Sequence, residues 1–157
     1  MHSLKGEKIF EDEFSVLQAD MVDICNEYSQ GMADKIFIYA ANEGMILVQH
    51  FYCINFNLYK CSKLNNAGVK VNFDTSDGCQ EQVLDILNED TQKIESVCRK
   101  YKQPVPKLMK FTYEPKTKKF NAEYTYENQT SDDVSVFDNY DAWFEEEKRR
   151  LEKIRGR

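Results

Sequence analysis

The segment Lys107–Glu127 reads KLMKFTYEPKTKKFNAEYTYE and carries the clearest structural pattern in the chain. In its second half the apolar residues occupy every other position: Phe120, Ala122, Tyr124 and Tyr126. Alternation with a period of two, in a run rich in aromatic residues, is typical of a half-buried β-strand. The first half repeats the pattern at Met109, Phe111 and Tyr113, and Pro115 begins a polar turn. We therefore predict a β-hairpin whose apolar face, including Tyr124, packs into the core and whose polar face is free for a partner.

Helical spacing of three and four residues precedes and follows this hairpin. It predicts a first helix with one apolar stripe, formed by Phe10, Phe14, Leu17, Met21, Ile24 and Tyr28. A second helix is predicted to start at Asp77 and to end before Pro104. Asp77 can cap it by forming a capping box with Gln80, and Ser76 and Thr75 are alternative caps. The last helix is predicted to begin near Asp138 or Asn139, with a broad apolar face formed by Tyr140, Trp143, Phe144, Leu151 and Ile154.

Further strands are predicted between the first two helices. Residues 35–41 and 45–54 read as a hairpin around a turn at Gly44, 55–63 as a possible third strand, and 64–73 as a loop. Residues 127–138 are polar and acidic and are predicted to form another loop. The order is α-β-β-(β)-α-β-β-α. We expect an α+β fold in one domain, residues 1–157, with an antiparallel sheet of four to five strands, flanking helices mainly on one face, and frayed ends.

Composition narrows the class of protein. A chain of 157 residues with 41% hydrophobic residues is long enough for one globular domain with its own core. It has no apolar run long enough to span a bilayer and no signal peptide, so we expect a cytoplasmic protein that does not bind membranes. Its five cysteines are odd in number and lack a C-x-x-C spacing, which predicts reduced, mostly buried thiols rather than disulfides or a zinc site.

Charge is distributed in blocks along a chain whose formal net charge is −6. Residues 120–147 contain nine acidic side chains and no basic one, whereas residues 98–119 and 148–157 are mainly basic. In the last helix the acids lie in the first turns and the bases in the last, which favours the helix dipole and explains part of the pattern. A field divided in this way can also steer a charged partner.

The sequence contains few candidates for catalysis. It lacks the glycine-rich phosphate loops and the nucleophile or metal motifs G-x-S-x-G and H-E-x-x-H. Of the two histidines, His2 lies in an N-terminus expected to be mobile, and His50 lies in an apolar strand where a structural role is expected. Glu123 and Glu127 could act as an acid–base pair, but both belong to the outward face of a strand. We therefore expect no enzyme, no cofactor and no metal.

Nucleic-acid binding is a weaker alternative. Basic residues accompany aromatic ones in the hairpin: Lys107, Lys110, Lys116, Lys118 and Lys119. The negative net charge and the block of nine acids would repel phosphates over much of the surface. We therefore expect a protein partner and no nucleic acid.

The chain resembles the YezG-like immunity proteins of bacterial polymorphic toxins. The resemblance lies in the strand KIFIY at 35–39, the aromatic strand 47–52, the helix that runs into a proline, and Phe111 followed by FNAEYTYE at 120–127. That group tends to carry a tryptophan before the first strand and another after the mid-chain proline, where this chain has Met32-Ala33-Asp34 and Val105.

The resemblance implies an antitoxin that binds the toxic C-terminal domain of a cognate secreted toxin, often a nuclease, and neutralises it in a 1:1 complex. An acidic surface can fill a basic nuclease cleft as a phosphate mimic. The candidate partner-binding residues are Glu123, Glu127, Asp132, Asp133, Asp138, Tyr140, Asp141 and Trp143. Tyr140 and Trp143 could instead belong to the core. The alternative function is a small acidic secretion chaperone that binds an effector segment as a dimer.

Overall fold

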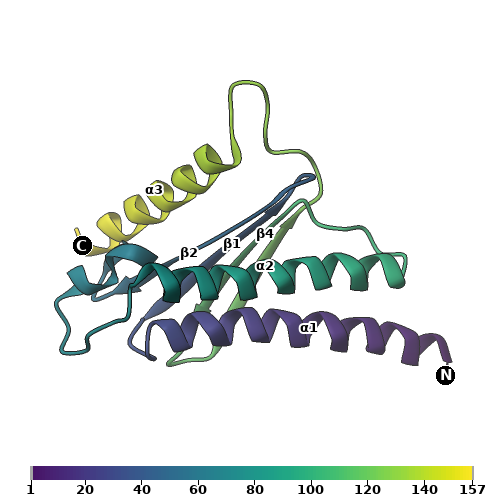
Figure 1. The fold of residues 1–157 in the computed structure, drawn as a ribbon, viewed down its shortest axis with the longest axis horizontal. Helices are drawn as coiled ribbons and strands as arrows, with labels where there is room; N and C mark the ends of the chain where they lie inside the picture. The colour runs from purple at the N-terminus through teal and green to yellow at the C-terminus, as the bar shows by residue number, and fades with distance from the viewer. Residues whose placement is uncertain (1, 157) are drawn as a thin grey trace.

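A computed structural model describes the backbone of residues 2–156 and the side chains of residues 9–156. The described chain forms three α-helices, a short 3-10 helix and a five-stranded antiparallel sheet (Figure 1). The elements in order are α1 (His2–Tyr28), β1 (Lys35–Asn42), β2 (Ile46–Ile54), β3 (Asn57–Lys60), η1 (Cys61–Ala67), α2 (Asp77–Lys100), β4 (Leu108–Glu114), β5 (Lys119–Thr125) and α3 (Val136–Arg155). The predicted α+β class and element order are confirmed. Met1 and Arg157, at the two chain ends that we expected to be frayed, lie outside the described residues.

The sheet has the strand order β3-β2-β1-β4-β5, so the two hairpins meet at β1 and β4. The predicted hairpin is present, with Phe111 opposite Ala122 and Met109 opposite Tyr124. The first hairpin turns where the sequence predicted, because Gly44 takes a φ of +94°, which favours glycine. The two ends of the sheet differ: β3 has four residues and is followed at once by η1, whereas β5 has seven residues and forms an open edge.

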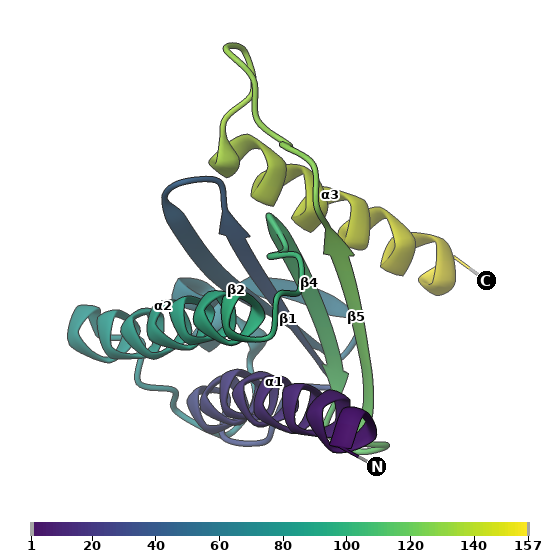
Figure 2. The same ribbon diagram turned by 90° about the vertical axis from the view of Figure 1, so that its right-hand side faces the viewer.

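The helices cover both faces of the sheet (Figure 2). Helices α1 and α2 pack on the face that carries Ile36, Ile38 and Tyr52. Helix α3 packs on the opposite face, over Phe37, Tyr39 and Phe51. The expectation that helices gather mainly on one face is therefore only partly right, because β1 and β2 are apolar on both sides and both sides need a cover. No helix in the described part of the chain has the length and apolar content to cross a membrane.

Serine caps both α2 and α3: α2 begins at Asp77 as predicted, with Ser76 as its cap among those that the sequence offered, whereas α3 begins earlier than predicted. Helix α2 is capped by Ser76, whose side chain accepts a hydrogen bond from the backbone N–H of Cys79. Helix α3 begins two residues before Asp138, because Ser135 caps it. Ser135 Oγ accepts from the N–H of Asp138 at 3.1 Å, and the Asp138 carboxylate accepts from the N–H of Ser135 at 2.8 Å. This reciprocal capping box satisfies two backbone donors at the helix start.

The apolar face of β5 is less buried than the alternation predicted. Tyr124 is 37% exposed and Phe120 is 39% exposed, so the prediction that Tyr124 is packed into the core is wrong. Helix α1 reaches the ring through Phe14, whose centroid lies 5.9 Å from that of Tyr124, and the amide of Gln18 donates a hydrogen bond to its hydroxyl. An edge strand has a neighbour on one side only, and a period of two cannot distinguish it from a central strand.

The cysteines are free, as predicted: Cys25, Cys53, Cys61 and Cys98 are buried, and Cys79 is partly buried. Burial raises the pKa of the Cys25 thiol to about 12. These thiols are therefore protonated at neutral pH and act as small apolar groups.

Candidate functional site

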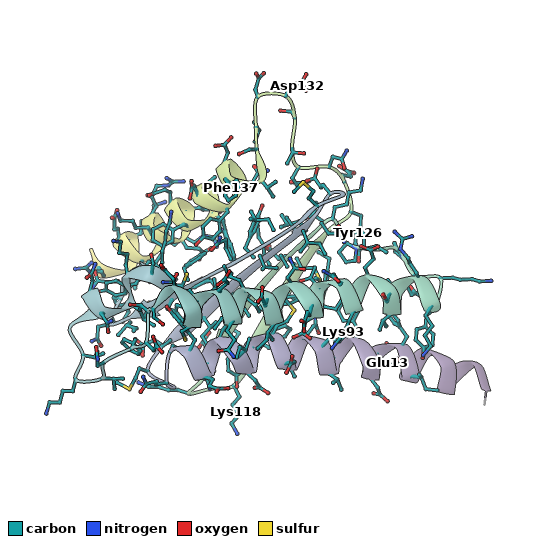
Figure 3. The ribbon with its side chains drawn as sticks, viewed as in Figure 1. Glu13, Lys93, Lys118, Tyr126, Asp132 and Phe137 are labelled. Carbon is teal, nitrogen blue, oxygen red and sulfur yellow. The ribbon has the colours of Figure 1, made fainter. Side chains whose placement is uncertain are left out.

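A loop between β5 and α3, residues 126–135, projects from the body of the molecule (Figure 1). We refer to it as the acidic loop, since Glu127, Asp132 and Asp133 are all exposed along it. Asp132 lies at its far end (Figure 3). This placement gives the carboxylates of Asp132 and Asp133 free access to a partner.

The base of the acidic loop is fixed to the turn between β1 and β2. The carboxylate of Glu43 accepts hydrogen bonds from the backbone N–H of Gln129 at 2.8 Å and from the hydroxyl of Thr130 at 2.7 Å. The amide of Asn139 in α3 donates to the Gln129 carbonyl at 2.9 Å. Lys107 donates to the side chain of Asn128 at 2.6 Å. Three separate parts of the fold therefore hold the same three-residue segment, 128–130.

Glu43 is suited to this anchoring because it stays ionised. Partial burial raises its pKa, but hydrogen bonds from Thr130 and from the backbone of Gln129 and Thr130, with the nearby charge of Lys107, lower the pKa below its ordinary value overall. Hydrogen bonds to an ionised acceptor are stronger than those between neutral groups. The anchor is therefore charged at neutral pH.

The tip of the acidic loop closes on itself. The N–H of Ser131 donates to the carbonyl of Val134 at 3.0 Å, and the N–H of Val134 donates back to the carbonyl of Ser131 at 3.3 Å. The Ser131 hydroxyl also accepts from the N–H of Asp133. This tight turn presents Asp132 and Asp133 at a defined position although no regular secondary structure contains them.

Two exposed apolar side chains follow these acids in the chain: Val134 comes directly after Asp133, and Phe137 lies at the base of the loop, where α3 begins. Phe137, in the first turn of α3, is 58% exposed, and Val134 is 36% exposed (Figure 3). Aromatic side chains are enriched at the centre of protein interfaces, where they supply buried area, and charged groups around them supply specificity. The site thus pairs one apolar anchor with two free acids.

The other predicted site residues fall into three groups. Glu123 is exposed on the polar face of β5, opposite Lys110 of β4. Asp138 and Asp141 are exposed but already paired, Asp138 in the capping box and Asp141 with Lys60 at 2.9 Å. Tyr140 and Trp143, which the sequence left open between anchor and core, are both buried against the sheet. We therefore exclude these two from the candidate surface.

Phe137 and Glu43 were missed at the sequence level. Phe137 could have been found, because Ser135 and Asp138 have the spacing of a capping box, which places Phe137 inside the helix, ahead of the predicted start. Glu43 could not, since its partners Gln129 and Thr130 lie 86 and 87 residues further along the chain.

The candidates for catalysis are placed as follows. His50 is fully buried, and its Nδ1 lies 2.5 Å from the hydroxyl of Tyr52. Burial lowers the pKa of His50 to about 3, so its ring is neutral at ordinary pH. The side chain of His2 lies outside the described residues. His50 is thus arranged as a structural residue, as the sequence predicted.

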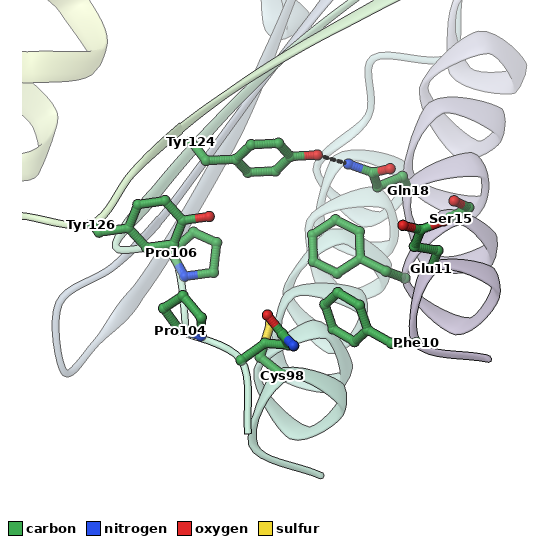
Figure 4. Close-up of a pocket in the computed structure, with 11 residues that line it drawn as sticks. Phe10, Glu11, Ser15, Gln18, Cys98, Pro104, Pro106, Tyr124 and Tyr126 are labelled. Atoms are coloured by element: carbon green, nitrogen blue, oxygen red, sulfur yellow. Dashed lines mark hydrogen bonds between the residues drawn. The ribbon is translucent and has the colours of Figure 1, made fainter. Parts of the chain in front are cut away.

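A hollow lies between α1, the end of α2 and β5 (Figure 4). It encloses about 300 Å³ and its lining includes Phe10, Phe14, Pro104, Tyr124 and Tyr126. The Gln18–Tyr124 hydrogen bond lies along one side of it (Figure 4), and a similar hollow, which shares Gln18 in its lining, lies beside Phe120 and Tyr113. Together these form an aromatic groove parallel to the edge of the sheet.

Comparison of the chain with models of protein families and with curated proteins found no match.

Proposed function

We propose that this protein is an immunity protein: it binds the toxic C-terminal domain of a cognate secreted bacterial toxin, a nuclease, and neutralises it in the cytoplasm, with one toxin domain for each chain. The proposal rests on the resemblance of the strands and of FNAEYTYE to the YezG-like group, and on one structural observation. That observation is the acidic loop, which projects from the fold, is anchored at its base, carries Asp132 and Asp133 near its tip, and is followed at the start of α3 by the exposed Phe137.

Anchoring favours binding because a flexible loop would lose conformational freedom when a partner orders it. Fixing a loop in its bound shape removes much of that cost. Glu43 and Asn139 hold the base of the acidic loop, and the Ser131–Val134 turn holds its tip. The loop can therefore act as a preformed projection that enters a cleft.

The charge of the loop indicates the chemistry of the cleft. Nuclease clefts are basic because they bind phosphates. Asp132 and Asp133 would occupy phosphate positions, and their field would increase the rate of encounter. Phe137 and Val134 would then fill apolar surface beside the cleft and slow dissociation.

The test is protection of growing bacteria. The toxin domain is taken from the gene adjacent to that of this protein and is expressed from an inducible promoter together with the wild-type protein or a variant. We expect wild type to restore growth and Asp132→Asn/Asp133→Asn/Phe137→Ser to lose protection. The matched control is Asp12→Asn/Asp85→Asn, which removes two exposed acids from α1 and α2 and should protect fully. Absence of protection by wild type would contradict the proposal.

The aromatic groove favours a second candidate, a secretion chaperone that binds an extended effector segment as a dimer. Its apolar lining and length along β5 suit an unfolded apolar peptide better than a folded domain. The nature of the bound species distinguishes the two functions. An immunity protein binds the isolated, folded toxin domain, whereas a chaperone binds a peptide from the effector and leaves the folded domain free.

A further inference from the structure

The open edge of the sheet lacks the proline, the β-bulge and the short length that protect many edge strands. Strand β5 has seven regular residues without proline, and two of its aromatic side chains, Phe120 and Tyr124, remain more than a third exposed. The opposite edge, β3, is only four residues long and packs against η1 and α3. A long, regular and partly apolar edge is a template for pairing with another strand.

The sequence of β5 is complementary to itself when two copies run antiparallel around Asn121. In this register Asn121 faces Asn121 of the second copy, and residues equally distant on either side face one another. Lys119 then lies opposite Glu123 of the second copy, and Glu123 opposite Lys119, on the polar face. Opposite charges at facing positions stabilise a strand pair.

The charge pairs extend into the neighbouring strands of each copy. Within one chain Glu123 lies opposite Lys110, and Lys119 lies opposite Glu114. Pairing around Asn121 therefore produces a row across four strands, Lys110, Glu123, then Lys119 and Glu114 of the second copy. The signs alternate at each step, and symmetry repeats the row in the opposite direction.

The other face of the strand fits in the same register. Phe120 comes to lie opposite Ala122 of the second copy, so a large ring faces a small side chain on both sides of the axis. Helix α3 packs on β1–β3 and on Leu108 of β4, and leaves Asn121 and Glu123 of β5 exposed. Shifting the centre to Glu123 would place two glutamates face to face, which is unfavourable.

We propose that β5 is a dimerisation edge, at which two copies of this chain join antiparallel around Asn121 into one continuous ten-stranded sheet. The acidic loop begins beyond β5, and the antiparallel arrangement places the two loops at opposite ends of the joined strands. Each loop stays free, so a dimer would bind two toxin domains. This inference does not depend on the proposed function.

The test uses charge reversal and mixing, measured by sedimentation velocity over a range of concentrations. Wild type should show a concentration-dependent dimer, and Glu123→Lys or Lys119→Glu alone should raise its dissociation constant by about tenfold or more. An equimolar mixture of the two variants restores both opposite-charge pairs and should form a heterodimer more tightly than either variant forms a homodimer. Wild type that remains monomeric, or a mixture no tighter than its components, would overturn the proposal.

Two further variants control for effects within one chain and for register. Lys110→Glu creates a like-charge pair with Glu123 within one chain, just as Glu123→Lys does with Lys110. It leaves the residues that pair between copies, Lys119 and Glu123, unchanged. The dimer of this variant should therefore persist. Asn121→Cys should form a disulfide between copies on mild oxidation, since facing Cβ atoms lie about 4.5–5.5 Å apart. Cross-linking through Glu123→Cys with none through Asn121→Cys would overturn the register around Asn121.

Discussion

The Glu43 carboxylate in the β1–β2 turn accepts a 2.7 Å hydrogen bond from the hydroxyl of Thr130, which lies 87 residues further along the chain. Through this contact and the one to the Gln129 backbone, the first hairpin determines where the acidic loop stands. The loop is therefore part of the tertiary structure, and its position depends on a residue outside it.

Replacing Glu43 by Ala should release the base of the acidic loop without unfolding the domain. Each lost hydrogen bond contributes on the order of 1 kcal/mol. Hydrogen exchange at the amides of residues 129–131 should accelerate several-fold, while exchange in β1 and β4 stays unchanged. Glu81→Ala, an exposed change on α2, serves as the control. Exchange that accelerates equally throughout the sheet would contradict a local anchoring role.

Acidification should destabilise the protein through His50. Burial lowers its pKa from 6.5 to about 3 in the folded state. The unfolded chain therefore takes up a proton as the pH falls below about 6.5, and the folded state does not. Between pH 6 and pH 3 this costs up to about 1.4 kcal/mol of unfolding free energy for each pH unit.

Chemical denaturation at pH 7 and pH 5 measures this effect. Wild type should lose more stability between the two values than His50→Gln, which lacks this titrating side chain. Burial also raises the pKa of Asp90 to about 7, but Asp90 is present in both proteins, so the difference between them isolates the histidine. Equal losses in both proteins would show that His50 is not kept neutral by burial.

An aromatic substitution in the core should cost more unfolding free energy than one at the edge of the sheet. Trp143 is 5% exposed, and its ring centroid lies 5.0 Å from that of Phe51 and 5.8 Å from that of Phe37. Trp143→Ala should lower the unfolding free energy by about 3–5 kcal/mol. Tyr124→Ala should cost about half as much or less, since its ring is already partly in water. Equal costs in urea denaturation would contradict the difference in burial.

Periodicity predicted the elements well because it reports which side of an element is apolar. It found the β4–β5 hairpin, the three α-helices and the buried position of His50. It could not distinguish a strand with one neighbour from a strand with two. The prediction therefore placed Tyr124 in the core, although its side chain is partly exposed. It also left Trp143 undecided, because only the packing of α3 on Phe37 and Phe51 determines where that ring points.

Only part of the candidate site could be predicted, because the sequence pattern reports local structure and not contacts between distant segments. The acids of residues 127–138 are visible in the sequence as a polar segment without periodicity. Their anchoring by Glu43 is a long-range contact and has no local signature. Phe137 was missed because the start of α3 was assigned to Asp138 or Asn139 instead of to the capping box of Ser135 and Asp138.

Charge in the acidic loop should act on the rate of association with the toxin domain. Asp132→Asn/Asp133→Asn should slow association several-fold at low ionic strength, and the difference should shrink near 1 M salt, where the Debye length is about 3 Å. Phe137→Ser should mainly accelerate dissociation. Stopped-flow mixing across a salt series separates the two effects. Association rates that do not depend on salt or on these acids would remove charge steering from the account.

Hydrogen exchange of the protein with and without its cognate toxin domain locates the interface. If the acidic loop binds the toxin, amides of residues 127–137 should become strongly protected in the complex, and protection should disappear in Asp132→Asn/Asp133→Asn/Phe137→Ser. Amides of α1 beside the aromatic groove should exchange at the same rate in both states. Protection confined to α1 and β5, with the acidic loop unchanged, would contradict the account.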